Sequence, residues 1–465
     1  MELLNNLVGI TNEFLWSKVL IIMLIVLGIY FTFRTNFVQF RFFGEMFRLL
    51  GDGAKGEKKE GAVSSFQAFC ISTASRVGTG NIAGIAMAVV AGGPGSVFWM
   101  WLIALIGSAS SFVESTLAQI FKIKDGEGFR GGPAYYMEQG LKNRTMGIVF
   151  SILITICFGF IFNAVQSNTI TAAFNNAFGM DRLVLGLILA TLTGIIIFGG
   201  VHRVAKVSEV IVPIFAVLYI LVSLFVVVIN IGEIPGIIKT IFESAFGLRE
   251  MAVGSMSGMI LVGIKRGLFS NEAGMGSAPN AAATASVSHP VKQGLIQTLA
   301  VFNDTLIICS CTAFIILLSD IDLNSGLTGI QLTQNALTSQ IGSFGSTFIA
   351  ICILLFAFSS IVGNYYYGES NIEFLTTNRV YINIYRVLVA AMVMFGSVAR
   401  LDIVWNLADI FMAFMAIINL IAIILLSKIA FAVLDDYRKQ KESGIKDPIF
   451  KAECIKYLKN ADEWK

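Results

Sequence analysis

The chain has 465 residues, of which 56% are hydrophobic and only 14% are charged. A water-soluble protein of this length needs more polar surface, so the composition indicates a protein embedded in a membrane. The net charge of +3 gives no reason to expect a nucleic-acid partner. Hydrocarbon requires every backbone group to be bonded within the protein, and the apolar runs are long and continuous. We therefore expect an all-α integral membrane protein.

The reactive side chains offer little for an enzyme. The six cysteines form no CxxC pair, and the two histidines belong to no HExxH motif. We therefore expect no disulfide framework, no zinc site and no catalytic activity. The first apolar run follows acidic Glu2 and Glu13, which favours a retained span over a cleaved signal peptide.

Eleven predicted spans follow one another along the chain. A helix needs about 20 apolar residues to cross the hydrocarbon core. Such runs cover residues 15–33, 64–91, 96–121, 146–176, 183–200, 208–230, 250–283, 294–318, 346–367, 382–398 and 404–427. After the first run, Val38–Leu50 sets aromatic residues against charged ones, as an interfacial helix or an ordinary connecting helix does.

The basic residues predict the orientation. Most of the 33 Lys and Arg fall in one alternating set of connections, which includes 34–59, 122–144 and the tail from Lys428. Positively charged loops stay in the cytoplasm. We expect a multi-pass protein of the inner (plasma) membrane with an external N-terminus and a cytoplasmic C-terminus, which agrees with an odd number of spans.

Two spans are interrupted by glycines and polar residues, at 74–84 (ASRVGTGNIAG) and 263–276 (GIKRGLFSNEAGMG). They lead two successive groups of five spans, and such pairs in inverted repeats indicate the central site of a transporter. The expected organisation is an N-terminal extra helix with its linker, a first five-helix repeat, an inverted second repeat and a cytoplasmic tail, covering residues 1–62, 63–230, 250–427 and 428–465.

The breaks predict the cargo. Unwinding exposes amide N–H groups that suit a carboxylate and carbonyls that suit a cation, so an α-amino acid with Na⁺ is expected. Gly78, Gly80, Asn81 and Gly263 are the candidate substrate-binding residues within the breaks. Residues 78–83 also fit a GxGxxA dinucleotide fingerprint, but no βαβ unit surrounds them. Close helix packing through the glycines is an alternative that is compatible with transport.

Polar residues of two other spans are candidates for the same site. Asn163 and Gln166 share one helical face, as do Ser360 and Asn364. Hydroxyl groups of the second pair's helix, together with carbonyls of the first break, provide the oxygen ligands that suit Na⁺. Simple cross-linking of helices is the alternative for each residue.

Ionisable residues inside spans are functional candidates, because burying their charge is costly. Arg76 lies at the first break, where it can hold a carboxylate or pair with Glu272 or Asp304. Glu114 completes this set. A gate or a structural ion pair fits these four residues as well as direct ligand contact does.

Several strings resemble the alanine/glycine:cation symporter family, the sodium:alanine symporters. They are SRVGTGNIAG (75–84), GGPAYYM (131–137), NAVQSN (163–168), RGLFSNEAGMGSAP (266–279), HPVKQG (289–294), FNDT (302–305) and YYYGE (365–369). The resemblance implies a LeuT-type fold of 5+5 inverted repeats with one additional helix. It also implies Na⁺-coupled uptake of a small neutral amino acid.

The resemblance also implies roles for individual residues. Gly78 and Gly80 offer backbone to the substrate, and Gln166 and Ser360 line its pocket. The implied sodium ligands are the carbonyls of three residues and the hydroxyls of two, which are Ala74, Val77, Phe356, Ser359 and Ser360.

Two positions depart from the family pattern. We expect relatives that carry alanine to have Trp at the position of Asn364 and Thr at that of Arg76. Asn in place of an indole makes the pocket larger and more polar, so glutamine is the first hypothesis for the substrate, with alanine or glycine as the alternative. A sensor that does not transport, or a carrier driven by another cation such as H⁺, stays open, and the sequence does not predict an oligomeric state.

Overall fold

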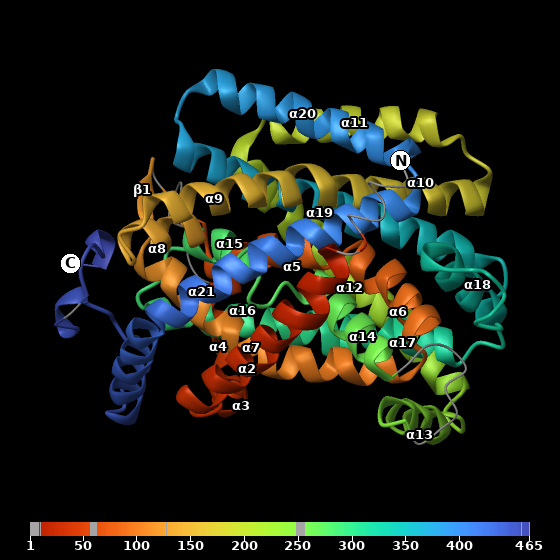
Figure 1. Ribbon diagram of the computed structural model, residues 1–465, viewed down its shortest axis with the longest axis horizontal. Helices are drawn as coiled ribbons and strands as arrows, with labels where there is room; N and C mark the ends of the chain where they lie inside the picture. Colours follow the sequence, from red (N-terminus) through yellow and green to blue (C-terminus); the bar gives the residue numbers. More distant parts are fainter. Residues whose placement is uncertain are drawn as a thin grey trace.

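Long helices lie side by side along the longest axis of the molecule (Figure 1). The computed structural model describes residues 9, 11–55, 63–126, 128–247, 256–456 and 458–464. Within these ranges, eight helices are long and apolar enough to cross a membrane, and one bent pair makes a ninth. The predicted class, an all-helical membrane protein, is therefore confirmed.

The elements follow the apolar runs of the sequence. The N-terminal half contains η1 (Leu15–Leu20), α2 (Ile21–Arg34), α3 (Val38–Arg41), α4 (Phe43–Lys55), α5 (Ser65–Arg76), η2 (Gly80–Gly84), α6 (Ile85–Gly92), α7 (Gly95–Ile120), β1 (Ile123–Asp125), β2 (Gly128–Arg130), α8 (Pro133–Gln139), α9 (Arg144–Ile154), η3 (Thr155–Phe162), α10 (Asn163–Phe178), α11 (Arg182–Ile197), α12 (Gly200–Ile229) and α13 (Ile234–Ala245). The remainder contains α14 (Met256–Asn271), α15 (Ala278–Thr284), α16 (Pro290–Phe302), η4 (Asn303–Cys309), α17 (Ser310–Leu317), α18 (Gly329–Ile341), α19 (Phe344–Leu375), α20 (Arg379–Val398), α21 (Leu401–Glu442), η5 (Ala452–Cys454) and η6 (Asp462–Trp464). Segments η1 to η4 are π-helical and continue directly into α-helices.

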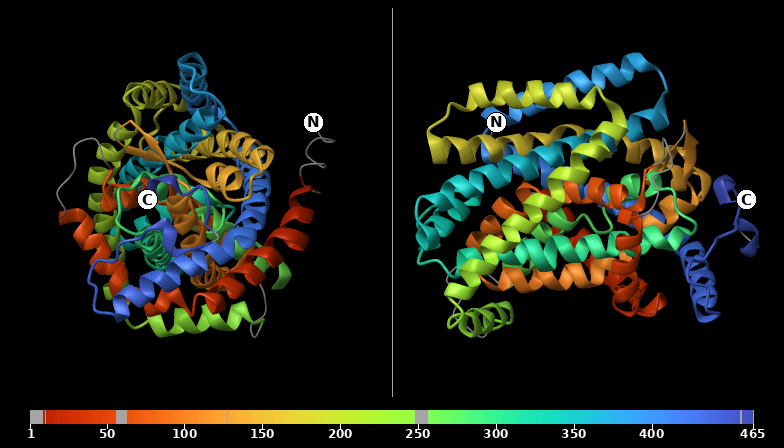
Figure 2. Two further views of the ribbon diagram at one scale, coloured as in Figure 1. Left: turned by 90° about the vertical axis from the view of Figure 1, so that its left-hand side faces the viewer. Right: turned by 180° about the vertical axis from the view of Figure 1, so that it is seen from behind.

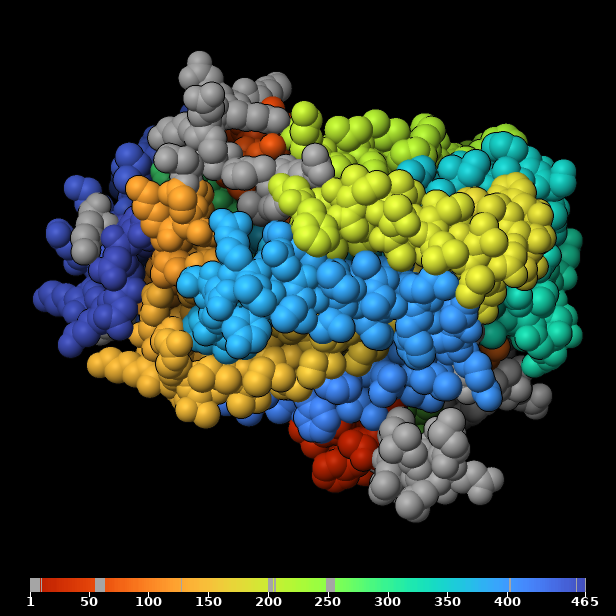
Figure 3. Space-filling model, turned by 90° about the horizontal axis from the view of Figure 1, so that it is seen from above, coloured from red at the N-terminus to blue at the C-terminus, as the bar shows by residue number. Residues whose placement is uncertain are grey.

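All eleven predicted runs contain helix within the described residues. The run at 183–200 is the shorter apolar helix α11, and the run at 250–283 divides into α14 and α15, so neither is among the nine. Residues 250–255 of that run lie outside the described residues. Helices α11 and α20 lie side by side on the face shown in Figure 3.

The first predicted break separates α5 from the helical segment Gly80–Gly92. The two axes differ in direction by 48°. A capping box between Ser64 and Gln67 begins α5, and Val77 ends it in an extended conformation. Helix geometry therefore stops at the glycine-rich stretch that the sequence indicated.

The second break separates α14 from α15. Its backbone reaches the left-handed region at Glu272, Gly274 and Gly276, with φ angles of 57°, 81° and 85°. Glycine enters this region freely, whereas the left-handed conformation is unfavourable for most other residues, including glutamate. The spacing of the two glycines therefore permits the turn, and Glu272 is held in a strained conformation.

One end of the molecule holds the C-terminus, α8 and β1, whereas α13 and α18 lie at the opposite end (Figures 1 and 2). We call the first of these the C-terminal end. There the start of α5 meets the end of α15, because Val63 and Ala285 form a parallel β-bridge. The Ser286 N–H donates to the Val63 carbonyl over 3.0 Å. Strands β1 and β2 form an antiparallel hairpin close by, with Ile123 opposite Arg130.

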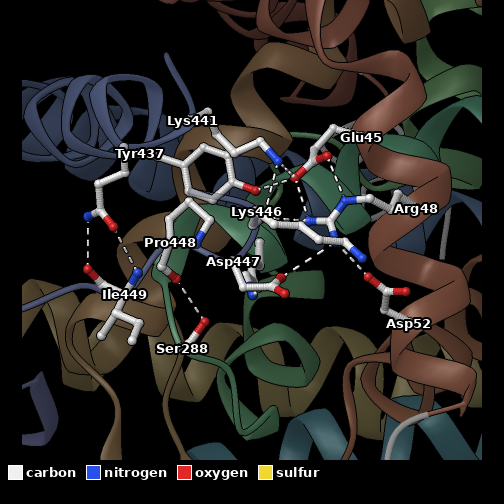
Figure 4. A network of polar contacts seen from close by, with 12 residues as sticks. Glu45, Arg48, Asp52, Ser288, Tyr437, Lys441, Lys446, Asp447, Pro448 and Ile449 are labelled. Carbon is white, nitrogen blue, oxygen red and sulfur yellow. Dashed lines mark hydrogen bonds and ion pairs between the residues drawn. The ribbon is translucent and has the colours of Figure 1, made fainter. Parts of the chain in front are cut away.

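The chain beyond α21 folds back on the same end. Asp447 accepts from Lys292 at 3.3 Å and lies 3.5 Å from Arg48 of α4. The Ser288 hydroxyl donates to the Pro448 carbonyl (Figure 4). The Phe450 N–H donates to the Ser288 carbonyl. The tail is therefore bonded to α4, to α16 and to the segment that follows α15.

Candidate functional site

The first break, α5 and α19 meet around the hydroxyl of Ser360. This oxygen lies 2.7 Å from the carbonyl oxygen of Ala74, 3.2 Å from that of Val77 and 2.9 Å from that of Phe356. A hydroxyl donates one hydrogen, so three converging carbonyls cannot all be satisfied by it. The excess of oxygen lone pairs at this point matches the ligand preference of a hard cation such as Na⁺. Ser360 is fully buried.

Ser359, the other predicted hydroxyl ligand, is also buried. Its hydroxyl donates to the carbonyl of Phe356 over 2.8 Å. Phe356 therefore lies within hydrogen-bond distance of both serines. The oxygen atoms of the five predicted sodium ligands form one cluster, connected through this carbonyl and the Ser360 hydroxyl.

The unwound segment after α5 is held by side chains that the sequence analysis selected. The Thr79 N–H donates to Oε1 of Gln166 over 2.9 Å, and the Gly78 N–H donates to Oδ1 of Asn81 over 3.0 Å. Gly78 has no room for a side chain, since a Cβ there would lie 2.4 Å from the Ser360 hydroxyl oxygen. The backbone of the break, Gln166 and the candidate cation site are therefore in direct contact.

The side chain of Asn81 also contacts segment η4. Its Nδ2 donates to Oδ1 of Asp304 over 2.6 Å. The other carboxylate oxygen of Asp304 accepts from Ser270 at 2.8 Å and from Thr305 at 3.0 Å. This carboxylate is fully buried and is bonded to neutral donors.

Asn364 lies on α19 one turn beyond Ser360. Its Oδ1 accepts from the hydroxyl of Ser75, at 2.7 Å, and that hydroxyl is also 2.8 Å from Oε1 of Glu272. The Nδ2 donor of Asn364 is buried and has no hydrogen-bond partner among the described residues. A polar group of a ligand can accept from this donor, because an unpaired buried donor is costly.

Arg76 and Glu114 have different surroundings from those that the sequence suggested. Arg76 is buried and approaches Oε1 of Gln297 at 3.3 Å, and it forms no ion pair within the described part of the chain. The predicted pairing with Glu272 or Asp304 is therefore absent as a direct contact. Glu114 accepts from the N–H groups of Gly274 and Gly276, both at 3.1 Å, and so holds the second break in its turned conformation.

Two candidate residues do not join this group of contacts. Gly263 lies apart from it, and Asn163 bonds within its own helix. Gly263 packs α14 against α7, since a Cβ there would meet the Ser96 carbonyl oxygen at 2.5 Å. Asn163 donates to the carbonyl of Gly159 on the same helix, and its Oδ1 has no partner among the described residues.

Three aromatic residues that the sequence analysis did not select cover the first break. The Phe269 ring lies between those of Phe162 and Trp405, with both centroid distances 4.6 Å and the ring planes tilted by 34° and 38°. A Cβ at Gly80 would lie 2.9 Å from Cδ1 of Phe269. Phe269 belongs to one of the family strings, but an aromatic residue in an apolar span gives no signal of its own, because most such residues fill cores.

Comparisons with known proteins show the family to which the chain belongs. Residues 1–452 match the family described as the sodium:alanine symporter family. The "Probable sodium/glutamine symporter GlnT" of Bacillus subtilis is 58% identical, over 100% of this chain and 96% of that protein. The "Amino-acid carrier protein AlsT" of the same organism is 57% identical, over 99% and 97%.

A more distant relative and a solved structure extend the comparison. The "Sodium/alanine symporter AgcS" of Methanococcus maripaludis is 36% identical, over 95% of this chain and 99% of that protein. A mutant manganese transporter of Eremococcus coleocola, 12% identical, shares the fold with a TM-score of 0.53 over 85% of this chain and 84% of that one. By the extent of the family match and the identity to these relatives, the chain belongs to the sodium:alanine symporter family.

Proposed function

We propose that the protein is a sodium-coupled symporter that imports a small neutral amino acid by alternating access. One observation carries this proposal, which is the contact between an oxygen-rich cluster at Ser360 and the unwound backbone at Gly78 and Thr79. Na⁺ binds to the carbonyls of Ala74 and Val77 with the Ser360 hydroxyl. The substrate carboxylate binds at the N–H groups of the break. There the Gln166 amide either donates to the carboxylate or moves aside, so that the carboxylate accepts from the Thr79 N–H in its place.

Glutamine is the preferred substrate in this proposal. The relatives include a probable sodium/glutamine symporter and a sodium/alanine symporter, so the family name leaves both possible. The unpaired Nδ2 of Asn364 favours glutamine, since its side-chain carbonyl can accept from this donor. Alanine has no such acceptor.

The arrangement in the membrane follows from the same proposal. The chain has eleven spans, formed by one additional helix and two inverted repeats of five, at residues 63–230 and 250–427, in a LeuT-type fold. The N-terminus (1–62) begins outside and the tail (428–465) is cytoplasmic, so the C-terminal end faces the cytoplasm across the plasma membrane. The opposite direction of the broken pairs α5–α6 and α14–α15 supports this symmetry, because α5 and α15 meet at that end.

Uptake of radiolabelled glutamine and alanine into proteoliposomes tests the proposal. We expect accumulation of glutamine that requires an inward Na⁺ gradient and that collapses when Na⁺ is equal on both sides. Accumulation driven by a proton gradient without Na⁺ would show that the coupling ion is wrong. Measurable binding without any accumulation would identify a sensor that does not transport.

A further inference from the structure

A cavity with charges of both signs opens at the C-terminal end, apart from the site around Ser360. It has a volume of about 180 Å³, whereas a single water needs only about 10–15 Å³. Three arginines and three acidic residues line it, together with Tyr366 and the last residue of α15. They are Arg130, Arg379, Arg386, Asp125, Glu369 and Glu373.

The cavity lies where the two broken spans come together. Val63 and Thr284 line it, and these residues adjoin the start of α5 and the β-bridge that joins α5 to α15. On α19, Tyr366 follows Gly363 by one turn, and Gly363 packs closely against the backbone of Ser75 in α5. The cavity therefore continues the α5–α19 contact toward the C-terminal end.

The distance from the central site is short. Helix α19 carries Ser360 at the candidate cation site and Glu369 in the cavity wall. Nine residues of α-helix advance roughly 14 Å along the axis. Along α19, the cavity therefore lies roughly 14 Å from the central site.

The charges match a zwitterion better than an ion of one sign. Arg386 pairs with Glu369 at 2.6 Å, and Arg130 pairs with Glu373 at 2.5 Å. These pairs bring positive and negative groups to the wall of one space. An α-ammonium group finds carboxylates here, and an α-carboxylate finds guanidinium groups.

Two groups in the wall are available for a ligand. Tyr366 is only 5% exposed, and within the described residues its hydroxyl forms no hydrogen bond. Arg379 is exposed and forms no ion pair in the part of the chain that the structure describes. A cluster of ion pairs with a purely structural role would not explain why the Tyr366 hydroxyl and the Arg379 guanidinium group lack partners among the described residues.

We propose that this charged cavity is a second, weaker binding site for the zwitterionic amino acid, occupied as the substrate leaves the central site toward the C-terminal end. This inference rests on the proposed function, because it takes the substrate class from it. Arg379 donates to the carboxylate of the amino acid, and the acidic residues of the cavity accept from its ammonium group. The Tyr366 hydroxyl orients the ligand.

Equilibrium binding of radiolabelled glutamine to the purified full-length protein tests this site without transport. The variant Gly78→Ala disables the central site, so the remaining binding is that of the cavity. We expect weak, saturable binding in this variant. The further changes Tyr366→Phe and Arg379→Gln should each weaken it by about tenfold, the effect of one hydrogen bond or charge contact.

Matched controls distinguish local from general effects. Tyr381→Phe removes a hydroxyl from an exposed tyrosine of α20, and it should leave the weak binding unchanged. Absence of saturable glutamine binding in Gly78→Ala, or equal binding with and without Arg379→Gln, would overturn the proposal. Failure of Na⁺-driven uptake by the wild-type protein concerns the proposed function instead, since the binding assay involves no flux.

Discussion

Asn81 and Asp304 are joined by a 2.6 Å hydrogen bond, in which the Asn81 amide donates to a fully buried carboxylate. The other end of the same amide accepts from the Gly78 N–H, at 3.0 Å. Asn81 therefore connects the backbone of the first break to an acidic side chain on η4. By sequence Asp304 is a candidate for an ion pair, whereas in the structure it fixes the orientation of Asn81.

Asp304→Asn should weaken glutamine binding by about tenfold. The change replaces a charge-assisted acceptor by a neutral one, so Asn81 holds the Gly78 backbone less firmly. Equilibrium binding in the presence of Na⁺ measures the effect. Asp322→Asn is the control, because Asp322 is exposed and, within the described residues, its side chain bonds to Asn324 alone. Unchanged glutamine binding in Asp304→Asn would show that the hydrogen bond between Asn81 and Asp304 does not contribute to substrate binding.

Gly78→Ala should reduce Na⁺-driven uptake by roughly a hundredfold, the usual cost of displacing a site by about 1 Å. The new Cβ would lie 2.4 Å from the Ser360 hydroxyl oxygen and 2.7 Å from Oε1 of Gln166, so both must move. Uptake is compared with that of Gly194→Ala, since a Cβ at Gly194 meets nothing within 4 Å. Equal uptake by the two variants would contradict the site described here.

Asn364→Leu should separate the two candidate substrates. Leucine has a similar size but removes the unpaired Nδ2, so the half-saturating concentration of glutamine should rise about tenfold. Alanine uptake should persist, because alanine has no group for this donor. The idea that Asn364 selects glutamine would fail if both substrates were affected equally.

Acid should weaken the contact between α4 and the C-terminal region. Burial by itself raises the pKa of Glu45, but hydrogen bonds from Arg48, Tyr437 and Lys441 outweigh it and lower this pKa to about 2, below the ordinary 4.5. The folded state therefore gains stability from Glu45 above pH 4.5, and it loses this as the pH falls toward 2.

Thermal unfolding of the solubilised protein measures this effect. Glu45→Gln should unfold at a lower temperature at neutral pH, and it should show less destabilisation on acidification than the wild type. Glu453→Gln, which changes an exposed acidic residue of the tail, should behave as the wild type does. A variant Glu45→Gln with the wild-type pH profile would show that another group is responsible.

The helices and both breaks could be predicted because their signals are local. Long apolar runs and glycine clusters describe a segment without reference to its neighbours. The contact between Ser360 and Ala74 was also within reach, because the family resemblance supplied the pairing of segments that lie 286 positions apart. The positions of these residues in the sequence do not by themselves show that the two segments meet.

Other features depend on packing that no local pattern contains. The contacts among Phe162, Phe269 and Trp405 join three distant segments, and each residue alone is typical of an ordinary core. Pairing with Glu272 or Asp304 was one alternative for Arg76, but in the structure its guanidinium group approaches Gln297 and Ser111. Charge indicates that a buried residue needs a partner, and only the fold determines which partner it finds.

The bridge between Val63 and Ala285 is made of main-chain atoms alone. Its hydrogen bond from the Ser286 N–H depends on no particular side chain, so both segments can change in evolution without loss of the junction. Proline at position 286 is the exception, since it removes the donor. Relatives can therefore retain this junction while sharing no residue at it, and a search for invariant side chains would pass over it.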